Sequence, residues 1–98
     1  MVSRHLQTSA KDGALTIRIN GPLDLMLTSA LKGCCQDSGS SYRRYIIDLE
    51  NVSVVRDSGL ALLLMLQRLT RRTGATLDVV NGTKSLKSRC IKLGIRPS

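Results

Sequence analysis

The residues best placed to do chemistry lie where a strand meets a helix, in the run Arg56-Asp57-Ser58-Gly59. An apolar strand, residues 45–49, precedes this run, and a very apolar helix begins at it. The first backbone N–H groups of a helix have no intrahelical acceptor, so this position favours negative charge, including that of a phosphate. Ser58 therefore places a hydroxyl where the fold would sense phosphorylation. A helix N-cap is the structural alternative for Ser58 and for Asp57, and Ser58 is able to serve in both roles.

The other reactive side chains form no catalytic or metal-binding pattern. His5 is the only histidine, and the sequence places no partner beside it, so neither a triad nor a metal centre can be drawn. The cysteines, Cys34, Cys35 and Cys90, lack zinc spacing, and three cysteines with one adjacent pair are a poor disulfide framework. We therefore expect no enzymatic activity, no metal and no cofactor, and thiols that stay reduced in the cytoplasm.

Alternating strands and helices must position the serine. Strands are predicted over residues 2–8, 14–19, 42–49 and 75–80, with a hairpin turn at Asp12-Gly13 and a third strand buried on both faces through Ile46-Ile47. Helices are predicted over 23–36, 59–72 and 84–93, with loops at 37–41 and 50–57.

Turn and cap residues mark the ends of these elements. Asn20-Gly21-Pro22 ends the second strand, and Asp24 is the candidate N-cap of the first helix. Gly74 and Gly94 end the second and third helices. The order β-β-α-β-α-β-α predicts a single α/β domain over residues 1–98, with a mixed sheet of about four strands and three helices.

The apolar faces of the helices indicate how they pack. In the first helix, Leu25, Ala30, Leu31 and Cys34 fall near one face. The second helix is apolar over more of its circumference: Leu60, Leu63 and Leu64 can face the sheet, and Leu62, Met65, Leu66 and Leu69 extend the stripe round the side. Such a helix is either covered by its neighbours or presents an edge to a partner protein.

The chain is strongly basic, with a formal net charge of +8 over 98 residues. This charge indicates an acidic partner, nucleic acid or an anionic membrane surface, or else a solvated basic face. Arg68, Arg71 and Arg72 crowd the last turn of the second helix, where cations suit the helix dipole. The two tyrosines are the only aromatic residues, which argues against nucleic-acid binding.

The longest apolar run, residues 60–66, is too short for membrane insertion, and the polar first ten residues do not resemble a signal peptide. We therefore expect a cytoplasmic protein.

Taken in order, these motifs resemble the STAS domain, the fold of the bacterial anti-sigma factor antagonists. The resemblance rests on three runs, and Gly74-Ala75 leading into a strand supports it. The runs are Asn20-Gly21-Pro22-Leu23-Asp24, Ile47-Asp48-Leu49 with Asn51-Val52, and Asp57-Ser58-Gly59-Leu60-Ala61.

The resemblance implies a protein-binding regulatory module that works by partner switching. Its partners would be a serine kinase of the GHKL ATPase type, which also acts as anti-sigma factor, and a phosphatase. Ser58 would be the phosphoacceptor. The switch loop and the partner-binding surface would comprise Asp24, Arg56, Asp57, Gly59, Leu60, Leu62 and Met65.

The phosphorylation motif departs from the usual family form, which is Asp, then Ser or Thr, then any residue, then Gly. Here only Ser58 separates Asp57 from Gly59. Aligned on the glycine, Asp57 takes the phosphoacceptor position and Arg56 that of the family's aspartate. Aligned on Asp-Ser, Ser58 is the acceptor and the loop is one residue shorter. In the first register Asp57 would act as a fixed negative charge.

Two further functions fit the sequence. Soluble single-domain members of the same family serve as non-catalytic subunits of bacterial lipid-transport ABC machines, and the run Gly59-Leu60-Ala61-Leu62-Leu63 resembles them. There the second helix would dock on an ATPase without phosphorylation. The other is a nucleic-acid or anionic-membrane binder driven by charge, whose binding would weaken steeply with salt.

Overall fold

A computed structural model describes residues 5–36 and 42–97. The predicted loop at 37–41 and the first residues of the predicted strand 2–8 lie outside the described residues. The elements, in chain order, are β1 (Leu6–Lys11), β2 (Ala14–Ile19), β3 (Gly21–Leu23), the 3₁₀ turn η1 (Leu25–Leu27), α1 (Thr28–Gln36), β4 (Arg44–Asp48), β5 (Val52–Val55), α2 (Asp57–Arg72), β6 (Thr76–Val80), α3 (Lys84–Lys92) and β7 (Arg96–Pro97).

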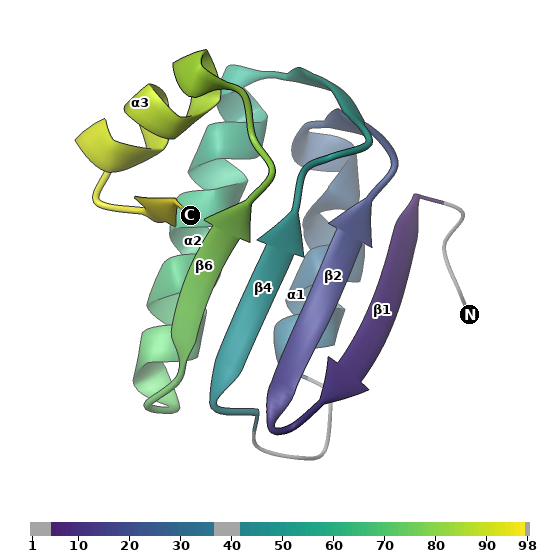
Figure 1. The fold of residues 1–98 in the computed structure, drawn as a ribbon, viewed down its shortest axis with the longest axis vertical. Coiled ribbons are helices and arrows are strands. Elements are labelled where there is room, and N and C mark those ends of the chain that lie inside the picture. Colours follow the sequence, from purple (N-terminus) through teal and green to yellow (C-terminus); the bar gives the residue numbers. More distant parts are fainter. Residues whose placement is uncertain (1–4, 37–41, 98) are drawn as a thin grey trace.

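The main sheet has five strands in the order β1-β2-β4-β6-β7 (Figure 1). Strand β1 runs antiparallel to β2, and β2, β4, β6 and β7 run parallel to one another. The β1–β2 hairpin turns at Asp12 and Gly13, whose φ angles of 51° and 78° lie in the left-handed region that a tight hairpin turn requires. The predicted α/β class, mixed sheet and Asp-Gly turn are thus confirmed.

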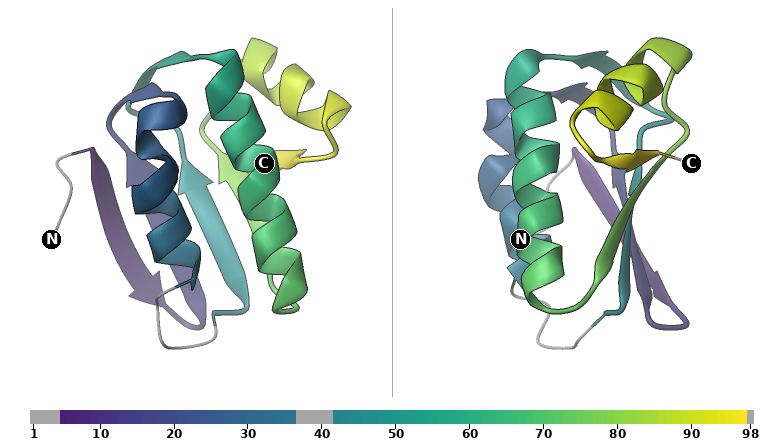
Figure 2. Two further views of the ribbon diagram at one scale, coloured as in Figure 1. Left: turned by 180° about the vertical axis from the view of Figure 1, so that it is seen from behind. Right: turned by 90° about the vertical axis from the view of Figure 1, so that its left-hand side faces the viewer.

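Helices α1 and α2 lie side by side on one face of the sheet, and α3 lies beyond the end where β4 and β6 finish (Figures 1 and 2). The inward side chains of the strands, such as Ile17 and Ile47, are fully buried beneath these helices. They meet Leu31 of α1 and Leu63 and Leu66 of α2, which are buried as well. The core is therefore aliphatic, as a chain with two aromatic residues requires.

The prediction that the third strand is buried on both faces is wrong. Ile47 is fully buried under the helices, whereas Ile46 points to the other face and is only partly buried. That face carries ion pairs instead: Arg44 Nε lies 2.6 Å from Asp78 Oδ2. An apolar pair of residues in one strand does not reveal whether a second layer covers the far face.

A second, two-stranded sheet pairs β3 with β5 in parallel, with Gly21 opposite Val52 and Leu23 opposite Val55. The predictions that no strand follows β2 before the first helix and that residues 52–55 belong to a loop are wrong, because strands of three and four residues have too little alternation to be recognised in the sequence. The predicted helix over 23–36 also differs, since Leu23 ends β3 and the 3₁₀ turn η1 precedes α1. The two-residue strand β7 was not predicted.

The helix ends follow the predicted cap residues. Gly74 and Gly94, both at φ 78°, follow α2 and α3. The Thr83 hydroxyl caps α3 by accepting a hydrogen bond from the Leu86 N–H at 3.2 Å. Among the helices of residues 5–36 and 42–97, none is both long and apolar enough to cross a membrane.

Candidate functional site

The predicted switch serine lies in the first turn of α2. The N-cap of this helix is Arg56, which has extended backbone angles and no side-chain capping bond. The backbone C=O of Arg56 accepts from the Gly59 and Leu60 N–H groups. The predictions that Ser58 or Asp57 caps the helix are therefore wrong, because both residues already belong to the helix.

Ser58 joins α2 to η1. Its side chain is half-buried, and its Oγ accepts a hydrogen bond from the backbone N–H of Leu25 at 3.1 Å. The two residues are 33 positions apart, so no local pattern predicts this contact. The serine oxygen fixes η1 relative to the helix start, and any group added to it would change that contact.

Asp57 points to a different neighbour. Its carboxylate Oδ1 lies 2.7 Å from Nη2 of Arg89 on α3, and the Asp57 side chain is 97% exposed. An ion pair this exposed contributes little to stability. The negative charge of Asp57 is therefore paired on the α3 side of the helix start, whereas the Ser58 oxygen faces η1.

Asp24 is the N-cap of the first helical segment, as predicted. Its Oδ1 accepts a hydrogen bond from the Met26 N–H at 2.9 Å, and its backbone is extended. The segment that it caps is η1, whose residues Leu25 and Met26 are 67% and 86% exposed. The prediction that Leu25 lies on a buried helix face is wrong, because η1 turns more tightly than the predicted α-helix.

Gly59 permits the closest approach between α2 and β3. A Cβ at this position would lie 2.3 Å from the carbonyl oxygen of Leu23 and 2.9 Å from its Cγ. The Arg56 N–H also donates to the same carbonyl oxygen at 3.1 Å. Gly59 is thus a packing requirement of the site, a role that sequence analysis did not assign to it.

The leucines predicted to meet a partner belong to the core. Leu60 and Leu62 are 7% and 4% exposed, so neither presents a surface to another protein. Met65 is partly buried against the core and keeps some surface. Of the three apolar residues of α2 predicted to bind a partner, Met65 alone remains available.

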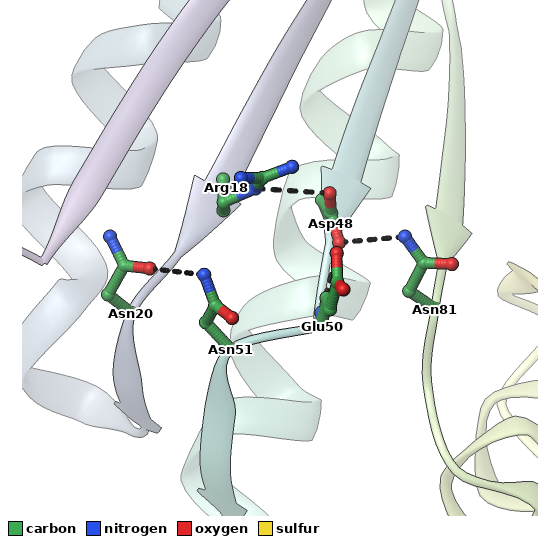
Figure 3. A network of polar contacts seen from close by, with 6 residues as sticks. All are labelled: Arg18, Asn20, Asp48, Glu50, Asn51 and Asn81. Atoms are coloured by element: carbon green, nitrogen blue, oxygen red, sulfur yellow. Dashed lines mark hydrogen bonds and ion pairs between the residues drawn. The ribbon is translucent and has the colours of Figure 1, made fainter.

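A polar network holds the loops at the same end of the sheet (Figure 3). Asp48 Oδ1 accepts from the Glu50 N–H at 2.9 Å and from the Asn81 amide at 3.1 Å, and its Oδ2 lies 3.3 Å from Arg18 Nε. Burial raises the pKa of Asp48, but the Glu50, Asn81 and Arg18 hydrogen bonds and the Arg18 charge outweigh it, so this pKa is lowered.

The same network ties the β2–β3 loop to the β4–β5 loop. The Asn51 side-chain amide donates to Asn20 Oδ1 at 2.9 Å (Figure 3). The sequence placed Asn20 in a strand stop and in a run that resembles the family, but did not predict this network.

A pocket of about 280 Å³ lies between β5 and the start of α3. Val52 and Leu86 contribute apolar walls, and Arg89, the partner of Asp57, lines it as well. Within the part of the chain that the structure describes, no group of three or more His, Cys, Asp or Glu residues is arranged to hold a metal ion. Burial raises the pKa of the Cys34 and Cys90 thiols, which is the opposite of the shift that makes a cysteine reactive.

The fold and this helix start define a class: a small α/β domain that has a serine in the first turn of its second long helix. Comparison with known proteins agrees with that class. The family model described as "Mlab, STAS domain" matches residues 6–95, and the chain belongs to the STAS domain family. No curated protein matches the sequence.

Three solved structures illustrate how widely the fold is shared. An RsbS variant from Moorella thermoacetica has a TM-score of 0.79 at 16% identity, covering 98% of this chain and 86% of that one. The unphosphorylated anti-sigma factor antagonist SpoIIAA has a TM-score of 0.76 at 18% identity, covering 95% and 86%. A sulfate transporter family protein from Wolinella succinogenes has a TM-score of 0.75 at 21% identity, covering 88% and 70%. At these identities the likeness shows the shared fold.

Proposed function

We propose that this STAS domain is a non-catalytic docking module that binds a partner protein through η1 and the first turns of α2. The docking surface consists of Leu25, Met26, Ser58, Ala61 and Met65. The observation that carries the proposal is the exposure of two consecutive large apolar side chains, Leu25 and Met26, directly beside the Ser58 hydroxyl. Exposed apolar side chains that gather on a helix–turn surface are typical of protein interfaces.

Two hydrogen bonds fix the conformation of this surface and place no charged side chain among its apolar residues. The Asp24 carboxylate accepts a hydrogen bond from the Met26 N–H, and the Ser58 hydroxyl oxygen accepts one from the Leu25 N–H. Both side chains therefore position η1 for docking. Ala61 and Met65 follow Ser58 at spacings of three and seven residues, which places them on the same side of α2.

For the partner we infer an ATPase subunit. The description of the matching family model as the Mlab type favours the lipid-transport ABC machine that sequence analysis drew from the same family. In that setting the docking surface works without phosphorylation, and the Ser58 hydroxyl serves as a fixed hydrogen-bond acceptor. This function needs no chemistry from the chain itself.

A second candidate is the phosphorylation-controlled antagonist, with a GHKL-type kinase and a phosphatase as partners. It is supported by the position of Ser58 in the first turn of α2, where the helix dipole tolerates a phosphate. A phosphate would add a charge of about −1.5 to −2 beside Leu25 and Met26. An apolar contact with the partner would then be lost. Asp57 is a poor substitute for this phosphate, because its carboxylate is paired with Arg89 on the other side.

The first test is recovery of partners from native lysate at moderate salt, with wild type and Met26→Glu compared by mass spectrometry. We expect ATPase and permease subunits of a transporter to be enriched by wild type and reduced roughly tenfold or more by Met26→Glu. Ile91→Glu is the matched control, since it charges an exposed apolar residue on α3 that lies outside the docking surface. Equal recovery by wild type and Met26→Glu would contradict the docking surface.

Two substitutions at Ser58 separate the candidates. If a kinase controls the domain, Ser58→Ala binds the partner constitutively and Ser58→Glu does not. If the partner is a transporter ATPase, Ser58→Ala binds no better than wild type, because phosphorylation does not release the wild-type domain. Equal binding by Ser58→Ala and Ser58→Glu would exclude the switch.

A further inference from the structure

Positively charged side chains without an ion-pair partner among the described residues gather at the end of the molecule where α2 finishes. The exposed side chains of this basic end are Lys11, Arg43, Arg68, Arg71 and Arg72. Ser58 and Arg72 lie at the two ends of α2, which has 16 residues and is therefore about 24 Å long. The centres of the basic end and of the docking surface thus lie near opposite ends of α2, although Met65 and Arg68 are only one turn apart on the same side of the helix.

Backbone contacts bring the segments of the basic end together. The Arg43 N–H donates to the carbonyl of Gly13 in the β1–β2 turn at 2.9 Å, and the Thr76 N–H donates to the carbonyl of Arg43 at 3.0 Å. The Ala75 N–H in turn donates to the carbonyl of Thr70 near the end of α2 at 3.0 Å. The hairpin turn, the start of β4 and the last turn of α2 therefore meet at one end of the fold (Figures 1 and 2).

The positive charges at this end are available to a ligand. The ion pairs within residues 5–36 and 42–97 use Arg18, Arg44 and Arg89, so none of the five cations of the basic end takes part in one. Asp78, the nearby carboxylate on β6, is held by Arg44 at 2.6 Å. Among the described residues, the hairpin turn itself contains one acidic side chain, that of the exposed Asp12. The field at this end is therefore strongly positive.

We propose that the basic end binds the surface of an anionic phospholipid membrane, with the docking surface left free. The cations come from three separate segments and spread over an end face, which suits a broad sheet of headgroup phosphates. Four of the five are arginines, whose planar forks bind phosphate oxygens in a bidentate manner. This inference rests on the basic end alone and is independent of the proposed function.

Nucleic acid is the less suitable occupant. Single-stranded nucleic acid is held by aromatic side chains on which its bases stack. The tyrosine nearest this end, Tyr42, instead packs edge-on against Tyr45, with ring centroids 5.8 Å apart, and is partly buried in the core. Tyr45 is buried as well, so neither ring offers a stacking platform.

Vesicle co-sedimentation tests the proposal with two variants that each remove three positive charges. One variant carries Arg68→Gln, Arg71→Gln and Arg72→Gln in the basic end. The matched control carries Lys84→Gln, Lys87→Gln and Lys92→Gln on α3. Each is measured with vesicles of phosphatidylcholine alone and of phosphatidylcholine mixed with phosphatidylglycerol, from low salt to about 0.15 M. Circular dichroism and thermal unfolding verify that both variants are folded.

We expect wild type to bind the phosphatidylglycerol vesicles and not the neutral ones, with binding that falls steeply as salt rises. The arginine variant should lose about a hundredfold in partition coefficient, since each surface cation contributes roughly fivefold. The α3 control should lose far less. Met26→Glu should bind vesicles almost as wild type does, which separates this test from that of the docking surface.

Three results would overturn the proposal. The first is absence of binding to phosphatidylglycerol vesicles at low salt. The second is an equal loss in the arginine and lysine variants, which would make net charge alone responsible. The third is binding of single-stranded RNA or duplex DNA that depends on the three arginines and is not matched by vesicle binding.

Discussion

The two ends of α2 differ in how their side chains are used. At the N-terminal end the side chains of Asp24, Asp48 and Ser58 all accept hydrogen bonds from backbone N–H groups, and Asp48 and Ser58 also link segments that are 33 positions apart. At the C-terminal end Arg68, Arg71 and Arg72 are exposed, and the structure gives them no ion-pair partner among the described residues. The arrangement of the N-terminal end therefore depends on tertiary contacts, whereas the exposed arginines of the C-terminal end depend mainly on the helix itself.

We therefore expect stability and binding to be separable in this domain. Substitutions at Asp48, Ser58 and Gly59 should cost folding free energy, because each removes or disturbs a contact between distant segments. Substitutions at the basic end should leave stability almost unchanged and act on binding alone.

Gly59→Ala should have the largest effect. The added Cβ would overlap the Leu23 carbonyl oxygen, which is backbone and cannot rotate away, so α2 and β3 must separate. We expect a loss of about 2–3 kcal/mol in the free energy of unfolding, measured by urea denaturation. Ala61→Ser, two residues further along the exposed side of α2, is the control and should change stability by less than about 0.5 kcal/mol. A loss of similar size in both variants would remove the special role of Gly59.

Asp48→Asn should destabilise the domain in a pH-dependent way. Because the pKa of Asp48 is lowered in the folded state, its carboxylate contributes stability that is present above its unfolded pKa of about 3.9. This contribution is lost as the pH falls through the lower, folded value. At neutral pH we expect a loss of about 1–2 kcal/mol, since the hydrogen bonds of Asp48 are charge-assisted.

The difference between wild type and Asp48→Asn should shrink as the pH falls below about 4, when followed by urea denaturation at each pH. Asp12→Asn, at the exposed hairpin turn, is the control and should cost less than about 0.5 kcal/mol at neutral pH. If the difference in unfolding free energy stays constant from neutral to acid pH, the negative charge of Asp48 does not contribute to the stability of the network.

Ser58→Ala should cost at most about 1 kcal/mol, because the Leu25 N–H would lose its side-chain acceptor but could still bind water. Amide hydrogen exchange at Leu25 and Met26 is the more direct measurement, and it should speed up in this variant. Ser29→Ala, an exposed position on α1, is the control and should leave exchange in η1 unchanged. Unaltered exchange in Ser58→Ala would indicate that the serine does not fix η1.

Arg71→Gln combined with Arg72→Gln should change stability least, by less than about 0.5 kcal/mol. The loss of favourable interaction with the helix dipole is offset by reduced repulsion between like charges. Thermal unfolding at low and moderate salt is the measurement. A loss comparable to that of Gly59→Ala would mean that the basic end is part of the folding core, and the separation between the two ends of α2 would fail.

The elements that the sequence predicted well are those whose signals are local. The strand at 14–19 has strict alternation and a two-residue turn before it, and its bounds match β2. The second helix ended at Thr73-Gly74 as predicted, because a left-handed glycine after the last turn is a local requirement. Asp24 was identified as a cap for the same reason, since its partner is two residues away.

The errors concern residues whose environment is set by distant segments. The strands β3 and β5 were missed because they are short and stabilise each other from positions about 30 residues apart. The exposure of Leu25, the burial of Leu62 and the partial exposure of Ile46 depend on which face another layer covers.

The sequence by itself determined the α/β class, the order of its main elements, the STAS resemblance and the presence of a serine at the start of the second helix, because local periodicity, turns and caps are sufficient for these. Tertiary structure alone decided that Ser58 holds Leu25, that Asp57 pairs with Arg89 and that Gly59 lies against Leu23. Each of these contacts joins residues more than 30 positions apart, and such contacts form only when the whole sheet and its helices have assembled.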